Sequence, residues 1–117
     1  MRRLAAIVVF SAAASSATAQ DIECKVGPSN VEIGGNQWDV FACSDGASIA
    51  VVSDAESPAH PFYFVLMVGN ETISLKGGGN GNKDATKTAF DELSVLNLAE
   101  VGALFHQATA SGRPQKN

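Results

Sequence analysis

Three side chains in one short segment have the types needed for acid–base chemistry. Asp54, Glu56 and His60 lie in a stretch with two prolines, which predicts a loop. A pair of carboxylates can cleave a glycosidic bond, and a histidine can act as a general base. No nucleophile accompanies them in a recognisable triad order. The sequence therefore favours a solvated acidic loop, with a small hydrolase that uses Asp54, Glu56 or His60 as one hypothesis.

The two cysteines, Cys24 and Cys43, could form a disulfide or supply two thiolates to a metal site. A structural zinc site needs four ligands at close spacing, whereas His60 and His106 each stand alone in the sequence. In an exported chain a pair of cysteines usually forms a disulfide. We therefore predict a Cys24–Cys43 disulfide, no metal and no cofactor. We expect His106 on the polar side of the last helix, away from Phe105.

A glycine-rich segment is the candidate partner-binding loop of the sequence, formed by Gly77, Gly78, Gly79, Asn80, Gly81 and Asn82. It lacks the Gly-Lys-Ser/Thr ending of a P-loop and the spacing of a dinucleotide fingerprint. Asn82 also stands where a calcium-binding glycine repeat has aspartate. The segment is therefore predicted to connect the last strand to the first helix, where it could reach a partner.

The predicted elements that position these residues are strands in the first part of the chain and helices in the last part. Alternating apolar residues predict strands at 22–26, 37–43, 48–53 and 72–76, with a short piece at 31–33 and a break at 27–30. Asp45-Gly46 and Gly69-Asn70 predict tight turns. A 3.6-residue period predicts helices at 85–96 and 98–110, with Asn97 as the cap of the second. For the first helix two starts stay open: a capping pair of Thr88 and Asp91, or an earlier start near Asp84. The fold class is α+β: a small antiparallel meander of four to five strands, followed by two C-terminal helices packed on one face.

The segment 62–68 is apolar at every residue. Such a strand is covered on both faces, or is covered on one face and meets a partner with the other. The helices are expected to cover one of its faces. Trp38, on an earlier strand, is predicted to lie in the core.

The first nineteen residues are typical of a secretory signal peptide. Arg2 and Arg3 precede an apolar run at 4–14, and Ala17-x-Ala19 suits a signal peptidase. The run is too short to span a bilayer, which predicts no membrane insertion. We expect a leader at 1–19, one domain at 20–110, a disordered tail at 111–117, and export to the bacterial periplasm or the exterior.

Without Arg2 and Arg3 the chain keeps 6 basic residues against 12 acidic ones, a net charge of −6. This charge repels phosphate backbones and excludes nucleic acid as an expected partner.

The segment Phe41-Ala42-Cys43-Ser44-Asp45-Gly46, followed by a returning strand, resembles the aromatic-x-Cys-…-Gly hairpin of the periplasmic C-type lysozyme inhibitors. In that family a Ser/Gly-rich loop after a later hairpin enters the enzyme cleft, and Gly77–Asn82 lies in a similar place without the Ser-Gly core. The resemblance implies an inhibitor of a cell-wall hydrolase such as lysozyme. The two predicted helices do not belong to that family's barrel.

The function that the sequence favours is a non-enzymatic binding or interaction module for an unknown protein or small ligand. This prediction rests on three absences from the sequence: a nucleophile with its base, a set of metal ligands and a cofactor loop. Inhibition of a cell-wall hydrolase and a small hydrolase activity are the alternatives.

Overall fold

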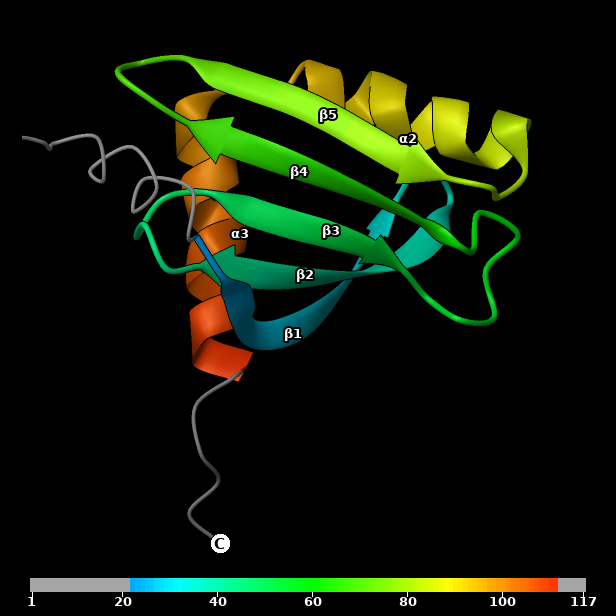
Figure 1. Ribbon diagram of the computed structural model, residues 1–117, viewed down its shortest axis with the longest axis horizontal. Coiled ribbons are helices and arrows are strands. Elements are labelled where there is room, and N and C mark those ends of the chain that lie inside the picture. Colours follow the sequence, from blue (N-terminus) through cyan, green and yellow to red (C-terminus); the bar gives the residue numbers. More distant parts are fainter. Residues whose placement is uncertain (1–21, 112–117) are drawn as a thin grey trace, which may run out of the picture.

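The computed structural model describes residues 22–111, which form a five-stranded antiparallel sheet followed by two helices (Figure 1). The strands pair in chain order: β1 (Cys24–Ile33), β2 (Asn36–Cys43), β3 (Ile49–Ser53), β4 (Phe62–Val68) and β5 (Ile73–Gly79). The helices are α2 (Lys83–Ser94) and α3 (Leu98–Ser111). The predicted α+β meander is confirmed. The predicted leader, and the predicted tail beyond Ser111, lie outside the described residues.

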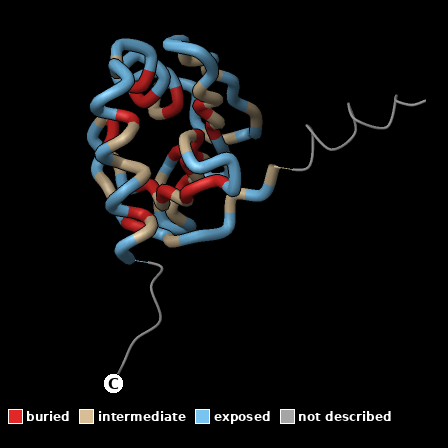
Figure 2. The backbone as a smooth tube through the Cα atoms, turned by 90° about the vertical axis from the view of Figure 1, so that its left-hand side faces the viewer, coloured by how far each residue is buried: buried red, intermediate tan, exposed pale blue. Residues whose placement is uncertain are grey.

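The core lies between the sheet and the helices, which pack on one face of the sheet behind the strands of Figure 1. Trp38, Val40 and Ala42 of β2 are fully buried on this inner face, which confirms the core position of Trp38. The buried segments gather in the interior of the molecule (Figure 2). α3 packs mainly against β1 and β2. α2 reaches β4 through Phe90, whose ring centroid lies 6.4 Å from that of Phe64.

The expected break at 27–30 is wrong, because β1 is one continuous strand. Two register shifts, between Cys24 and Val26 and between Val26 and Ser29, absorb the irregular residues as bulges. Gly27 has a φ of +139°, and a Cβ on it would lie 2.8 Å from the carbonyl oxygen of Val40. Glycine is therefore required where the chain bulges against β2, and the sheet continues past it.

The prediction that the strands end before Gly77 is also wrong. Gly77, Gly78 and Gly79 belong to β5 and pair with Phe64, Tyr63 and Phe62 of β4. A Cβ on Gly77 would lie 2.7 Å from Cδ1 of Phe64, so the ring occupies the space of the missing side chain. Glycine alone disfavours a strand, but here three consecutive aromatic residues cover it and the ladder continues.

The helix boundaries depend on two asparagine caps. Asn82 accepts a hydrogen bond from the N–H of Ala85 at 3.0 Å, so α2 begins at Lys83. This agrees with the expected earlier start near Asp84 and not with a Thr88–Asp91 cap. Asn97 caps α3 as predicted: its Oδ1 accepts from the Glu100 N–H at 2.8 Å, while a Glu100 carboxylate oxygen accepts from the Asn97 N–H at 2.9 Å. This reciprocal capping box separates the two helices.

The tip of the β1–β2 hairpin is fastened to the middle of α2. The N–H of Gly34 donates to Oε1 of Glu92 at 2.7 Å, and the hydroxyl of Thr88 donates to the carbonyl of Gly34 at 3.1 Å. A Cβ on Gly34 would lie 2.6 Å from the nitrogen of Ala89, whereas a Cβ on Gly35 would meet nothing within 4 Å. The hairpin and the helix therefore approach each other at Gly34 as closely as the backbone allows.

This geometry predicts different costs for two adjacent substitutions. Both glycines have a positive φ, +60° at Gly34 and +86° at Gly35, so alanine at either position costs about 1–2 kcal/mol of stability in backbone strain. Gly34→Ala must also push α2 away, which adds about 1–3 kcal/mol, and Gly35→Ala is its matched control. Urea unfolding measures both, and equal losses would contradict the contact with α2.

Candidate functional site

The loop that joins β3 to β4 holds the three residues with acid–base potential but does not bring them together. Asp54 and Glu56 line an open hollow of about 280 Å³ beside the β1–β2 hairpin. Oδ1 of Asp54 accepts the backbone N–H of Glu56 at 3.0 Å, so this oxygen shapes the loop. His60 is not part of the lining of this hollow.

His60 instead contacts the end of β3. Its Nδ1 lies 2.9 Å from Oγ of Ser53, which is buried and also accepts the N–H of Phe62 at 3.0 Å. The imidazole tautomer sets the direction of this bond: an unprotonated Nδ1 accepts the Ser53 hydroxyl proton, whereas a protonated Nδ1 donates to Oγ. The sequence analysis missed this serine–histidine contact. Here it ties the loop to the first residue of β4.

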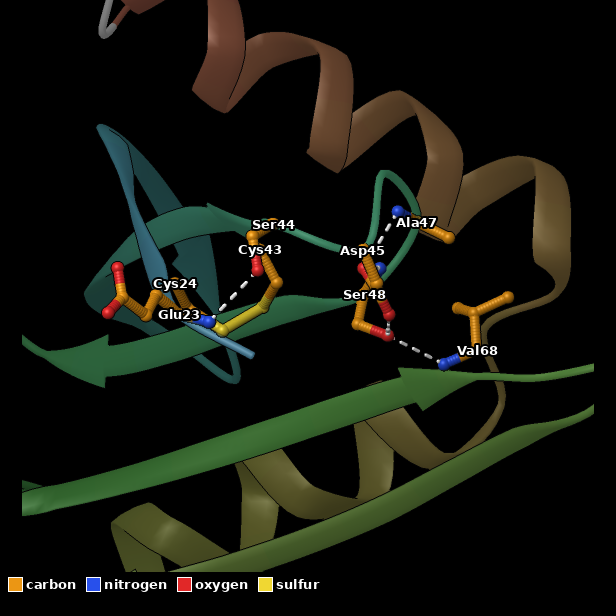
Figure 3. The surroundings of a disulfide bond; sticks show 8 residues. All are labelled: Glu23, Cys24, Cys43, Ser44, Asp45, Ala47, Ser48 and Val68. Atoms are coloured by element: carbon orange, nitrogen blue, oxygen red, sulfur yellow. Dashed lines mark hydrogen bonds between the residues drawn. A yellow bond between two sulfur atoms is a disulfide. The ribbon is translucent and has the colours of Figure 1, made fainter. Parts of the chain in front are cut away.

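The disulfide between Cys24 and Cys43 is present, as predicted, with an S–S distance of 2.04 Å (Figure 3). The two residues are directly opposite each other in the ladder between β1 and β2. Ser44 continues the ladder past the disulfide: its N–H donates to the carbonyl of Glu23 at 2.7 Å, and its hydroxyl accepts from the Glu23 N–H at 3.0 Å. This end of the sheet is therefore cross-linked and hydrogen-bonded.

Asp45 organises the neighbouring turn (Figure 3). Its Oδ1 accepts the N–H groups of Ala47 and Ser48, and its Oδ2 accepts the hydroxyl of Ser48. The same Ser48 oxygen accepts the N–H of Val68 at 2.9 Å, which links the turn to the end of β4. Partial burial acts to raise the pKa of Asp45, but these hydrogen bonds to the carboxylate outweigh it and hold the pKa below the usual 3.8.

The lowered pKa predicts an acid-dependent contribution to stability. Because the folded pKa of Asp45 lies below 3.8, its carboxylate contributes stability that is fully present above that value and is lost as the pH falls through the folded pKa. Asp45→Asn is expected to lower the urea midpoint at pH 7, with a difference from wild type that shrinks at pH 2.5. A difference that stays constant with pH would contradict this role.

Only half of the glycine-rich segment is a loop. Asn80, Gly81 and Asn82 connect β5 to α2, and the N–H groups of Asn80 and Asn82 donate to the carbonyls of Pro61 and Pro58. A Cβ on Gly81 would overlap the carbonyl of Ala59. The connection is therefore packed against the β3–β4 loop, and the glycines before it lie on the edge strand.

β5 is one of the two edge strands of the sheet, and its free hydrogen-bonding groups can be assigned. The N–H of Gly69 donates to the carbonyl of Thr72, and the N–H of Asn80 donates to the carbonyl of Pro61. In an antiparallel pair, hydrogen-bonded positions alternate. Every second residue between these two bonds therefore faces β4, and the others direct both backbone groups to the free edge: Ile73, Leu75, Gly77 and Gly79.

The other edge of the sheet is protected against strand addition. β1 carries two bulges, Pro28 and an ion pair between Lys25 and Glu23, and such features are common on protected edges. β5 has no register shift along its seven residues and no proline, and its last three residues are glycines. The free edge of β5 is therefore long, regular and accessible.

An apolar groove lies beside the free edge of β5. We call it the β5–α2 groove: a hollow of about 660 Å³ with ten lining residues, Glu71, Ile73, Leu75, Phe90, Leu93, Ser94, Leu96, Asn97, Leu98 and Ala99. Phe90 and Leu98 are 44% and 40% exposed, which is high for large apolar side chains. The two β5 residues in this lining, Ile73 and Leu75, are among the four whose backbone groups face the free edge.

The outer face of the sheet, opposite the helices, is also apolar. The ladders align Phe41, Ala50, Val65 and Lys76 in one row from β2 to β5. Tyr63, in the adjacent row, is 49% exposed, and its ring lies over Gly78. No helix of residues 22–111 covers this face (Figure 1). The apolar side chains of this face lie on β2 to β4, while its β5 residues are Ser74, Lys76 and Gly78.

His106 is exposed on α3, as expected for the polar side of the helix, but its ring does not lie away from Phe105. The two rings are 6.0 Å apart in an edge-on arrangement, and both line a hollow of about 200 Å³ beside Gly46. Within the described part of the chain, no three His, Cys, Asp or Glu side chains cluster as metal ligands would. No helix among residues 22–111 has the length and apolar character needed to cross a membrane.

Sequence reasoning singled out the glycines but missed the apolar side chains beside them. The available signal was the position of Phe90 at the edge of the apolar side of its helix. Phe90 and Leu98, the first residue of α3, fit core positions of a helical pattern, yet they are 44% and 40% exposed. Comparison with models of protein families, with curated proteins and with solved structures gives no match to this chain.

Proposed function

We propose that this protein is an exported, non-enzymatic binding module that captures an extended polypeptide segment as a sixth strand beside β5. The observation that carries the proposal is the pairing of a regular edge strand, without bulges or proline, with an apolar groove. The free backbone groups of β5 offer main-chain hydrogen bonds, which give affinity in strand addition, while side-chain pockets give specificity.

The groove is in the right place to receive side chains of such a segment. The inner row of the sheet runs from Ala42 through Ile49 and Leu66 to Leu75. The first three of these residues are buried, and Leu75 lines the β5–α2 groove. An apolar residue placed opposite Leu75 would extend this row and lie between β5 and α2. Each methylene buried there would contribute about 0.8 kcal/mol.

The signal-peptide pattern and the disulfide support a partner outside the cytoplasm. Both are typical of proteins outside the cytoplasm. We infer that the partner is a protein segment met there. Acid–base chemistry in the hollow beside Asp54 and Glu56 is less favoured, because one carboxylate oxygen of Asp54 already accepts a backbone hydrogen bond within the loop.

The test is selection of peptides followed by hydrogen exchange. Random peptides displayed on phage are selected on the protein, and the exchange of its backbone amides is measured with and without an enriched peptide. Binding is expected to slow exchange at Ile73, Leu75, Gly77 and Gly79, which face the free edge. A library without binders, or binding that leaves these four amides unchanged, would overturn the proposal.

Two substitutions of Leu75 distinguish the contribution of its backbone N–H to peptide binding from that of its side chain. Leu75→Ala removes apolar surface from the groove but keeps the N–H, whereas Leu75→Pro also removes the N–H that faces the free edge, without removing a hydrogen bond to β4. Both should weaken peptide binding, Leu75→Pro more strongly. Circular dichroism confirms that each variant is folded. Equal affinities for the two variants would argue against strand addition.

The alternative, that the protein is a hydrolase, predicts a different experimental result. If the protein turns over a cell-wall glycan or a model ester, and Asp54→Asn, Glu56→Gln or His60→Ala abolishes turnover without lowering the unfolding midpoint, the binding-module proposal is wrong. Inhibition of lysozyme that is lost in Leu75→Pro would instead identify the captured segment as part of that enzyme.

A further inference from the structure

Lys76, at the end of the outer row of side chains, favours a particular charge on the residue of the added strand that lies opposite it. Lys76 is exposed, and across the ladder it faces only the apolar Val65. The ion pairs formed among residues 22–111 are Lys25–Glu23 and Lys87–Asp91, so Lys76 has no acidic partner in the described part of the chain. The position beside it, on the far side from β4, is the one that an added strand would fill.

The alternation of hydrogen bonds along β5 brings the residue opposite Lys76 on an added strand close to Lys76. Lys76 bonds to β4 through its backbone, so a residue opposite it on an added antiparallel strand forms a pair without direct hydrogen bonds. The side chains of such pairs are the closest across a sheet, with Cα atoms about 4.5 Å apart. Opposite charges in this arrangement stabilise the pairing, and like charges destabilise it.

The same geometry disfavours a second copy of the chain as the added strand. Symmetric antiparallel pairing of two β5 strands that uses all four free residues places Ile73 against Gly79 and Leu75 against Gly77. Lys76 of one copy then lies directly opposite Lys76 of the other. Lysine on an edge strand is a common barrier to such pairing. Charge repulsion therefore disfavours self-pairing in the register that uses the whole edge, whereas a foreign segment meets no such repulsion.

We propose that the segment captured by β5 carries an aspartate or glutamate opposite Lys76, with an apolar residue on each side of it in the sequence. This inference rests on the proposed strand addition and names the chemistry of its partner. The acidic side chain lies on the outer face beside Lys76. Its two neighbours point to the inner face, one toward Leu75 and the β5–α2 groove and the other toward the rings of Phe62 and Phe64 that lie over Gly77.

The experiment uses three synthetic peptides that differ at one residue, Thr-Val-Thr-Val-Glu-Val-Thr and its versions with Gln or Lys at the fifth position. Binding to the full mature protein is measured by calorimetry at low salt, with hydrogen exchange as before. The Glu peptide is expected to bind about two- to fivefold more tightly than the Gln peptide, and the Lys peptide more weakly than both. In Lys76→Glu the order should reverse, and in Lys76→Gln it should vanish.

A matched variant controls for net charge. Lys25→Gln removes the same charge from the opposite edge strand, β1, and should keep the order Glu, Gln, Lys. If the peptides protect the four edge amides but bind equally well, the proposed charge pairing is wrong and strand addition stands. If none protects these amides, strand addition itself fails. Concentration-dependent protection of the edge without any peptide would show self-pairing and overturn the inference.

Discussion

Replacement of Trp38 by alanine is expected to lower the free energy of unfolding by about 3–5 kcal/mol. Trp38 is fully buried at the centre of the inner face, and its indole N–H donates to the carbonyl of Ile33 at 3.1 Å. Its ring centroid lies 5.4 Å from that of Phe64, which in turn lies 5.0 Å from that of Phe62. Alanine would leave a cavity beneath this aromatic chain and remove the indole hydrogen bond to Ile33.

Trp38→Ala should also weaken the pairing of β4 with β5, the edge strand proposed to bind a segment. Phe64 lies over Gly77 of β5, so a cavity at Trp38 lets the ring shift away from the glycines that it covers. Urea unfolding followed by circular dichroism measures the stability, and hydrogen exchange at Ser74, Lys76 and Gly78 measures the β4–β5 ladder.

Trp38→Phe is the matched control for the tryptophan. It keeps an aromatic ring against Phe64 but loses the hydrogen bond to Ile33, and should cost about 1–3 kcal/mol. If Trp38→Ala and Trp38→Phe are equally stable, packing of the ring beneath Phe64 does not stabilise the fold as we infer.

Removal of the disulfide in the double variant Cys24→Ala/Cys43→Ala is expected to cost about 3 kcal/mol. The cysteines are separated by 19 positions in the sequence and are opposite each other at the end of the β1–β2 ladder. Without the bond, the unfolded chain gains the entropy of an open loop. The folded protein keeps the Glu23–Ser44 hydrogen bonds at this end. A domain of this size has a small margin of stability, so the effect is a large share of the total.

Urea unfolding followed by the fluorescence of the single tryptophan measures this loss. Wild-type protein in reducing buffer is the control and should unfold near the midpoint of the double variant. A double variant as stable as the oxidised wild type would contradict the role of the disulfide. Peptide binding should persist in the folded variant, because the disulfide lies at the opposite edge of the sheet from β5.

Local patterns in the sequence were sufficient for the strand order, the core position of Trp38, the second helix cap and the disulfide. Alternation along β2 separates a buried face from an outer one because successive side chains of a strand point in opposite directions. Asn97 followed by Glu100 three residues later specifies a capping box by itself, since both hydrogen bonds form within one turn. These features depend on neighbours in the chain, so a single sequence contains them.

The other features of the fold and of the candidate site depend on contacts between residues that are far apart in the sequence. Gly77, Gly78 and Gly79 have no side chains to signal a strand, and only the opposite aromatic residues of β4 keep them in the ladder. Gly27 and Pro28 read as a break, but pairing with β2 carries the strand through them as a bulge. The groove beside Phe90 exists only once α2 crosses back to the hairpin at Gly34. The sequence therefore determined the order of strands and helices, because that order depends on local patterns. Tertiary packing decided how far β1 and β5 extend and which apolar side chains stay open to a partner.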